Sequence, residues 1–230
     1  MPPETDATTS IIVAAFAPLA GKRILDVGCG AGILARSLSA LGARVSGVDP
    51  NAKALALARG AVPAGTFHRA GAESLPFADG TFDGVVFLNS LHHVPKPAMS
   101  LALEEAARVV VPAGPIVVVE PLAEGSFFSA LRPVEDETDV RTAAQEVLRR
   151  ALEGGAFEQI RRVDYLRRER FEGLDEFLAR IVAVDPARAA VVGEHRLEVE
   201  AAFQRHARIA ADGRMTLEQP MRAHVLAAKA

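Results

Sequence analysis

A short apolar run that ends in a glycine-rich turn and restarts as a helix occupies Arg23 to Ala35, and it constrains the fold more than any other stretch. The run holds Ile24, Leu25 and Val27, which suit a buried parallel strand. Three glycines follow, and leucines then recur at helical spacing. Glycine lets a ligand approach the backbone, which a Cβ would prevent. The stretch therefore predicts the first strand–loop–helix unit of a doubly wound α/β sheet, with a ligand at the carboxyl edge of the strands.

The spacing of these glycines distinguishes between kinds of nucleotide-binding loop. They are Gly28, Gly30 and Gly32, and Asp26 stands two residues before the first. A dinucleotide-binding turn follows Gly-x-Gly-x-x-Gly, which would place the third glycine at position 33. Ile33 stands there instead. Because structural glycine turns are common in α/β proteins, the loop alone does not decide the function.

Further strands and helices are expected to alternate along the chain. Strands are predicted at 44–48, 66–70, 82–88, 116–120, 160–171 and 215–226, and helices at 5–19, 52–59, 99–110, 138–152, 174–184 and 194–209. We expect one domain over 1–230. Its parts are a cofactor-binding core at 20–121, a variable acceptor-side insertion with helices at 122–211, and a closing strand at 212–230.

Three segments together resemble the class I S-adenosylmethionine-dependent methyltransferases of the UbiE-like group, also called type 11. Asp26 with the three glycines is similar to motif I of that family. The stretch from Ala72 to Asp83 reads Ala-Glu-Ser-Leu-Pro-Phe-Ala-Asp-Gly-Thr-Phe-Asp, close to the family's next motif, and Leu-His-His-Val follows at 91–94. The resemblance implies a Rossmann-like seven-stranded sheet whose last strand is antiparallel. It also implies S-adenosylmethionine as cofactor and S-adenosylhomocysteine as product.

A carboxylate for the cofactor's ribose is expected where the second strand ends. Asp49 and Pro50 come about 20 residues after Gly28, the distance at which nucleotide-binding sheets place such a carboxylate. Two carboxylate oxygens can accept from both hydroxyls of a diol. Asp49 could instead cap the helix expected over 52–59.

The resemblance also implies the remaining cofactor contacts. We expect a cofactor-binding set drawn from the loops after four strands: Asp26, Gly28, Cys29, Gly30, Gly32, Asp49, Pro50, Gly71, Ala72, Glu73 and Asn89. Gly71 departs from the family, which usually has Asp there, facing the adenine with the next backbone amide. The Ala72 N–H is still expected to bond the adenine ring, whereas the acceptor for the exocyclic amine is missing or supplied elsewhere. Small size explains Cys29 better than reactivity.

Methyl transfer from a sulfonium needs alignment of donor and acceptor, and a base only when the acceptor is a weak nucleophile such as a hydroxyl. His92 and His93 are the candidate bases, since imidazole changes charge near neutral pH. Glu120, at the end of a neighbouring strand, could orient one of them or cap a loop. The other histidines lack metal-ligand spacing, so no metal site is predicted.

Composition narrows the partners. The net charge is −3 with one cysteine, which disfavours nucleic-acid binding and excludes a disulfide framework. No apolar run reaches the length of a membrane span and no signal pattern is evident, so a cytoplasmic protein with a small-molecule acceptor is expected. A homodimer is left open. The alternatives are an NAD(P)-dependent oxidoreductase, disfavoured by Ile33 and by the lack of a Tyr-x-x-x-Lys pair, and a non-catalytic cofactor-binding module.

Overall fold

The computed structural model of the chain describes residues 7–185 and 187–229, which fall into two compact units. Unit 1 comprises residues up to Glu120 together with Ala143–Val163 and the segment from Arg222 onward. Unit 2 comprises Pro121–Thr142 and Asp164–Met221. The outer limits of the expected domain, residues 1 and 230, lie outside the described residues.

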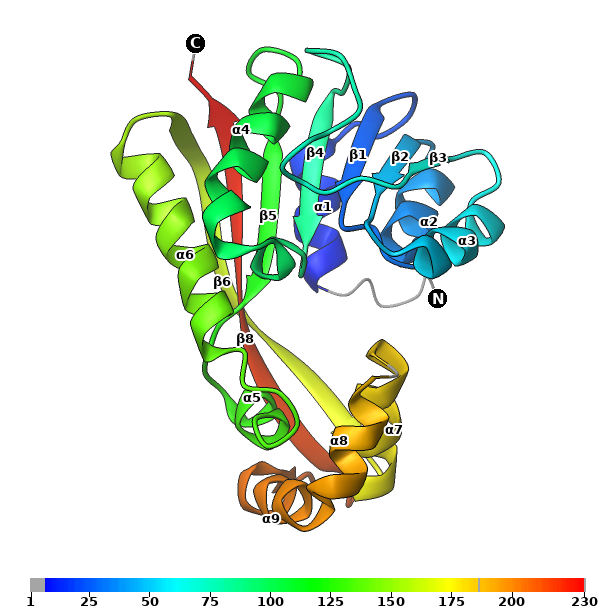
Figure 1. The fold of residues 1–230 in the computed structure, drawn as a ribbon, viewed down its shortest axis with the longest axis vertical. Helices are drawn as coiled ribbons and strands as arrows, with labels where there is room; N and C mark the ends of the chain where they lie inside the picture. Colours follow the sequence, from blue (N-terminus) through cyan, green and yellow to red (C-terminus); the bar gives the residue numbers. More distant parts are fainter. Residues whose placement is uncertain (1–6, 186, 230) are drawn as a thin grey trace. The chain divides into compact units, whose positions relative to one another are not determined.

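The strands predicted from the sequence form one sheet (Figure 1). They are β1 (Arg23–Val27), β2 (Arg44–Val48), β3 (Thr66–His68), β4 (Gly84–Leu88), β5 (Ile116–Pro121), β6 (Phe157–Phe171) and β8 (Met215–Ala228). Their order is β3-β2-β1-β4-β5-β8-β6, and β1 to β5 are parallel where they pair. The sheet is mostly parallel with an antiparallel edge, and it has eight strands where seven were expected. A two-residue strand, β7 (Arg208–Ile209), pairs with β8 and was not predicted.

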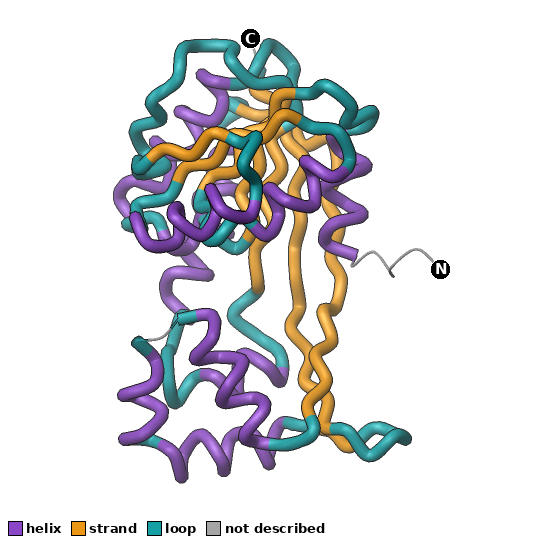
Figure 2. Tube along the Cα trace, turned by 90° about the vertical axis from the view of Figure 1, so that its right-hand side faces the viewer, coloured by secondary structure: helices purple, strands orange, loops and turns teal. Residues whose placement is uncertain are grey.

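Strand register assigns the two faces of the unit 1 sheet. Leu25 lies beside Val85, and both belong to a core cluster with residues of two helices, α4 (Met99–Val109) and α6 (Thr138–Glu153). Ile24 lies beside Gly84 and faces the other way. A Cβ on Gly84 would collide with the ring of Phe16, so α1 (Ala7–Phe16) packs on that second face. Helices on both faces define a doubly wound sheet (Figure 2).

Three further helical segments of unit 1 border the carboxyl ends of its strands. They are α2 (Ile33–Ala40) after β1, α3 (Ala52–Ala61) after β2, and the short η1 (Leu91–His93) after β4, which η2 (Lys96–Ala98) follows. Helices α2 and α3 contact each other, and Gly32 makes this possible because a Cβ there would lie 3.0 Å from Ala58 Cα.

Unit 2 has its own aromatic core. Its helices are α5 (Ser126–Leu131), α7 (Leu174–Val184), α8 (Arg188–Glu194) and α9 (Arg196–His206). Phe177 is fully buried and packs edge-to-face against Phe127 and Phe171, with ring centroids 5.7 and 5.5 Å apart. A buried ion pair between Arg141 and Glu137 lies beside this core, with the guanidinium over the Phe128 ring.

Several predicted boundaries were wrong, mostly in unit 2. The helix expected over 194–209 is interrupted at His195, ends at His206 and is followed by β7. The segment 126–131 lies in the variable insertion, where no helix was predicted at this place. It forms α5, whose four apolar side chains are buried. The helix expected over 5–19 covers Ala7–Phe16, and residues 5 and 6 lie outside the described part.

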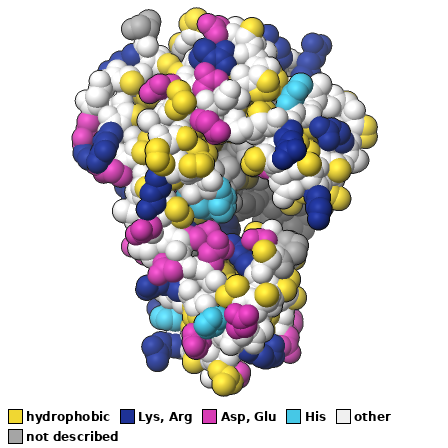
Figure 3. Space-filling model, in the orientation of Figure 1, with side chains coloured by type: hydrophobic (Ala, Val, Ile, Leu, Met, Phe, Trp, Pro, Cys, Tyr) yellow, Lys and Arg dark blue, Asp and Glu magenta, His cyan; other side chains and the backbone are white. Residues whose placement is uncertain are grey.

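Within the described ranges, no helix combines the length and the apolar character needed to cross a membrane. On the face drawn in Figure 3, acidic and basic side chains are interspersed over the surface.

Candidate cofactor-binding and catalytic site

The loop between β1 and α2 folds back on the end of β2. The backbone N–H groups of Gly28 and Cys29 both donate to the Val48 carbonyl, at 2.8 and 3.0 Å. Gly28 has φ +73, and a Cβ there would collide with the Ser90 side chain at the end of β4. The glycine therefore lets the ends of β1, β2 and β4 converge.

Gly30 and Asp49 meet at the centre of this loop. The Gly30 N–H donates to Asp49 Oδ2 at 2.9 Å, and the Asn51 N–H donates to Asp49 Oδ1 at 2.8 Å. Asn51, not Asp49, caps α3, since its Oδ1 accepts from the N–H groups of Lys53 and Ala54. Asp49 is therefore free of the capping role that the sequence left open. Its carboxylate is held in place with acceptor capacity remaining on both oxygens.

Two buried side-chain oxygens at this edge of the sheet lack a hydrogen-bond partner among the described residues. They are Asp26 Oδ2 on β1 and Asn89 Oδ1 just after β4. Asn89 has φ +52, a left-handed conformation that Asn tolerates better than most residues. Burial, and next the charge of Asp49, raise the pKa of Asp26 to about 7. Orphaned buried acceptors are rare, and these two suit a ligand that donates hydrogen bonds or carries positive charge.

Cys29 is buried, and burial followed by the charges of Asp26 and Asp49 raises the pKa of its thiol to about 12. Since the thiolate is the nucleophilic form, Cys29 is unreactive at neutral pH. The space around the Gly30 α-carbon differs, because a Cβ there would meet no atom within 4 Å. Gly30 thus borders open space at the turn, whereas Cys29 packs inward.

The loop after β3 adjoins Asp49 and Pro50. The Asp49 N–H donates to the His68 carbonyl at 3.3 Å, and Arg69 Nε donates to the Pro50 carbonyl at 3.1 Å. Gly71, Ala72 and Glu73 follow at once in the chain. The structure therefore brings the loop from which the adenine contacts were predicted next to the predicted ribose carboxylate.

Two residues of α4 that the sequence analysis missed hold the continuation of this loop. Arg108 donates to the carbonyls of Phe77 and Leu75 at 2.7 and 3.1 Å, and to Asp79 Oδ1 at 2.8 Å. Glu105 accepts from the Leu75 N–H at 2.8 Å and pairs with Arg108. Their spacing on a helix is unremarkable in sequence, so no pattern could have revealed the contact.

Glu120, at the end of β5, organises the turn after β4. Its Oε1 accepts from the backbone N–H groups of Ser90 and Leu91 at 3.1 and 2.9 Å, and its Oε2 contacts His92 Nδ1. Glu120 and His92 are 1% and 3% exposed. Glu120 therefore both caps the loop and orients an imidazole, the two roles that the sequence left open.

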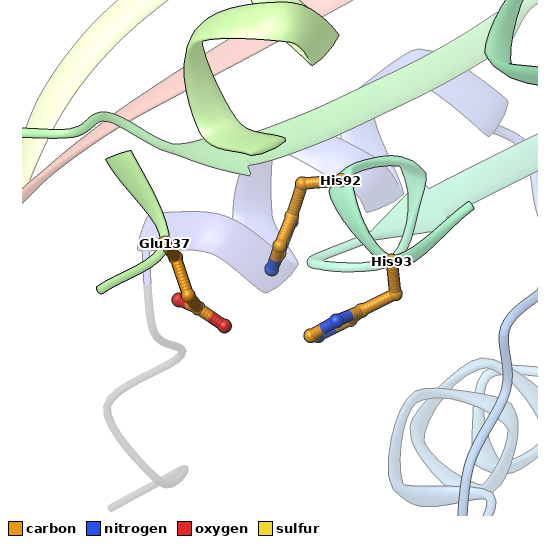
Figure 4. Close-up of side chains that lie close together, drawn as sticks. All are labelled: His92, His93 and Glu137. Atoms are coloured by element: carbon orange, nitrogen blue, oxygen red, sulfur yellow. The ribbon is translucent and has the colours of Figure 1, made fainter. Parts of the chain in front are cut away.

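His93 is exposed, unlike its neighbour, and its ring centroid lies 4.0 Å from that of His92. Figure 4 shows both imidazoles extending from η1. Ser90, which the sequence analysis did not single out, braces the same turn because its hydroxyl donates to the Val27 carbonyl at 2.6 Å. The only sequence feature that could have indicated a role for Ser90 is its position between Asn89 and the histidines.

All the candidate residues thus lie in unit 1, at the carboxyl ends of adjacent parallel strands or in the loops that follow them. This is the edge at which doubly wound sheets bind nucleotides. Fold and loop geometry are those expected of a nucleotide-binding α/β site.

Comparison with known proteins gives a more particular result. Residues 25–118 match a family model for a methyltransferase domain. A ubiquinone biosynthesis O-methyltransferase of Thiobacillus denitrificans is 45% identical over 103 residues, which cover 43% of this chain and 44% of that protein. The corresponding protein of Aromatoleum aromaticum is 44% identical over 105 residues, covering 44% of each chain. The matched segment therefore spans less than half the length of these curated relatives.

Solved structures share the fold over a longer range. The YcgJ protein from Bacillus subtilis has a TM-score of 0.65 at 19% identity, covering 97% of this chain and 99% of its own. A methyltransferase from Geobacter sulfurreducens, solved with S-adenosyl-L-homocysteine, has a TM-score of 0.60 at 16% identity, covering 98% and 92%. At such identities the likeness concerns the fold alone. The sequence matches over residues 25–118 support a class I S-adenosylmethionine-dependent methyltransferase, and they do not favour the oxidoreductase alternative.

Proposed function

We propose that the protein is an S-adenosylmethionine-dependent methyltransferase that methylates a hydroxyl group of a small molecule. The observation that carries the proposal is the pairing of an open glycine turn with a fixed carboxylate, Gly30 N–H to Asp49 Oδ2 at 2.9 Å. Asp49 then accepts from the ribose hydroxyls. Gly30 leaves the room that the cofactor needs against the backbone.

The orphaned acceptors fit the amino-acid end of this cofactor. An ammonium group donates hydrogen bonds and carries positive charge, so it satisfies Asp26 Oδ2, and Asn89 Oδ1 offers a further acceptor for its hydrogen bonds. When bound, S-adenosylmethionine supplies an electrophilic methyl group on a sulfonium. The residues of this chain contribute alignment, exclusion of water and, for a hydroxyl acceptor, removal of a proton.

His92 is the proposed general base. Glu120 accepts a hydrogen bond from His92 Nδ1–H in the proposed tautomer, so that Nε2 is the basic position. The same carboxylate stabilises the imidazolium that forms. The ring of His93 lies against that of His92. The matched relatives are named O-methyltransferases, which agrees with a hydroxyl acceptor.

A methyl-transfer assay tests this assignment. The protein is incubated with methyl-labelled S-adenosylmethionine and a panel of phenols, alcohols, amines and thiols, and labelled product is counted. We expect turnover on hydroxylated acceptors. His92→Gln should lower kcat about 100-fold or more, in the range that general bases contribute.

The controls separate the base from general damage. His195→Gln removes a half-buried imidazole of unit 2 and should leave kcat unchanged. Cofactor affinity should survive in His92→Gln. Turnover of amines or thiols alone, with His92→Gln fully active, would refute the base role. Cofactor binding without turnover on any acceptor would support the non-catalytic module.

A further inference from the structure

The carboxylate of Glu73 occupies the space that a side chain at position 71 would take. A Cβ built on Gly71 would lie 2.5 Å from Glu73 Oε2 and 2.6 Å from Glu73 Cδ. Gly71 has no positive φ, so its backbone conformation does not demand glycine. Glycine at position 71 leaves the room into which the Glu73 carboxylate folds, and a side chain there would displace that carboxylate.

Glu73 has no evident structural task. It is half-buried, and the part of the chain that the structure describes offers its carboxylate no hydrogen-bond or ion-pair partner. A partly desolvated carboxylate without a partner costs free energy, which a ligand that donates to it can recover.

The position of this carboxylate limits what the ligand can be. The loop after β3, which carries Glu73, starts beside Asp49 and Pro50. The Asp49 N–H donates to the His68 carbonyl, and Arg69 donates to the Pro50 carbonyl. A nucleoside whose ribose is held by Asp49 has its base within a few ångströms of the sugar, and this loop borders that region. Arg108 and Glu105 hold the far end of the loop, so Glu73 is presented on a braced segment.

Glu73 and its neighbour offer an acceptor next to a donor. An ionised carboxylate only accepts hydrogen bonds, and the Ala72 N–H only donates. The amino edge of adenine is complementary, because its exocyclic amine donates and the adjacent ring nitrogen accepts. A 6-oxo purine presents an acceptor at the same place and faces the carboxylate without a bond.

We propose that Glu73, folded over Gly71, accepts the hydrogen bond from the exocyclic amine of the cofactor's adenine and makes the site select amino over oxo purines. The inference rests on the proposed function, since it concerns the same cofactor. It assigns to position 73 the acceptor that position 71 lacks.

The test is calorimetric titration of the full chain with S-adenosylhomocysteine and with its 6-oxo analogue, S-inosylhomocysteine. The wild-type protein should bind the amino form about 10- to 100-fold more tightly, which is the range of one hydrogen bond to a charged group. Glu73→Ala should lose this preference by weakening the amino form alone. Glu104→Ala, which removes an exposed carboxylate of α4, is the matched control and should keep it.

A double variant tests whether the lost preference is due to the missing carboxylate and not to damage of the loop. Gly71→Asp combined with Glu73→Ala clears the crowded position and returns a short carboxylate to it, so the preference for the amino form should reappear. If Glu73→Ala keeps the wild-type ratio of the two affinities, the inference is overturned while the proposed function stands. If the wild-type protein binds neither ligand, the proposed function fails and the inference fails with it.

Discussion

The chemistry of Asp26 can be tested directly through the pH dependence of ligand binding. Its buried carboxyl has a pKa of about 7, so at pH 6 it is mostly protonated in the free protein. The ammonium of the cofactor, in the proposed binding mode, favours the ionised form of Asp26, so binding at pH 6 must first release the proton. We expect the affinity for S-adenosylhomocysteine to be about tenfold weaker at pH 6 than at pH 8, the effect of one pKa unit. Calorimetry at the two pH values measures it, and Asp26→Asn should show no such change.

The same carboxyl should oppose folding at alkaline pH. Its folded-state pKa is raised above the ordinary 3.8, so the stability it contributes is fully present below about pH 4 and is lost as pH rises through 7. At pH 8 the penalty reaches up to about 4 kcal/mol from the size of the shift. Urea unfolding of the free protein should therefore show Asp26→Asn to be more stable than wild type at pH 8 and no more stable at pH 4. A loss of stability at pH 8 would mean that Asp26 has a structural partner.

Gly30 and Gly80 form a matched pair for testing the glycine turn. Both have positive φ, +51 and +61, and a Cβ on either meets nothing within 4 Å. Each Gly→Ala change should cost about 1–2 kcal/mol of stability from backbone strain alone. Only Gly30→Ala should also weaken S-adenosylhomocysteine binding, because its methyl enters the cofactor's space. Equal binding by both variants would place the cofactor elsewhere.

At the scale of elements, α4 is predicted to hold the loop after β3, from which the adenine contacts are expected, through Arg108. Arg108→Leu removes its bonds to Leu75, Phe77 and Asp79, and should cost about 1–3 kcal/mol of stability. Hydrogen exchange of the backbone amides over 71–80 should speed up, and S-adenosylhomocysteine should bind more weakly. Arg149→Leu, which breaks only ion pairs within α6, is the control. Unchanged exchange over 71–80 would remove Arg108 from this role.

The strands and helices from Arg23 to Glu120 could be predicted because several local sequence patterns indicate the same structure there. Apolar strands, glycine turns and helical spacing coincide from Arg23 to Glu120, and β2 and the start of α3 fall where predicted. In unit 2 the signals conflict. Helix α5 has 6 residues, too few for a helical period to stand out in the sequence. The pattern over 194–209 continues across His195, although the helix breaks there.

The candidate site shows the same division between local and distant information. Sequence alone indicated Asp49, Glu120 and the histidines, because each lies at or just after the end of a strand. It could not show that Glu120 bonds His92, that Ser90 packs on Gly28, or that Glu73 fills the space over Gly71. Those contacts depend on how loops from different strands converge.

At the scale of the whole molecule, two hydrophobic cores predict separable stabilities. Phe177 in unit 2 and Phe87 in unit 1 are both fully buried, so Phe→Leu at either position should cost about 1–3 kcal/mol. Hydrogen exchange should quicken mainly in α7 and α9 for Phe177→Leu and mainly in the β1–β4–β5 sheet for Phe87→Leu. Equal effects of both changes throughout the chain would show a single cooperative unit.

The methyltransferase assignment depends on which nucleoside cofactor this chain binds. Isothermal titration with S-adenosylmethionine, S-adenosylhomocysteine and NAD, in parallel, is the most direct measurement. We predict micromolar binding of the first two, none of NAD, and weakening by about 1–3 kcal/mol in Asp49→Ala from the lost charge-assisted bonds to the ribose. Binding of NAD alone, or binding of S-adenosylhomocysteine that is unchanged in Asp49→Ala, would contradict it.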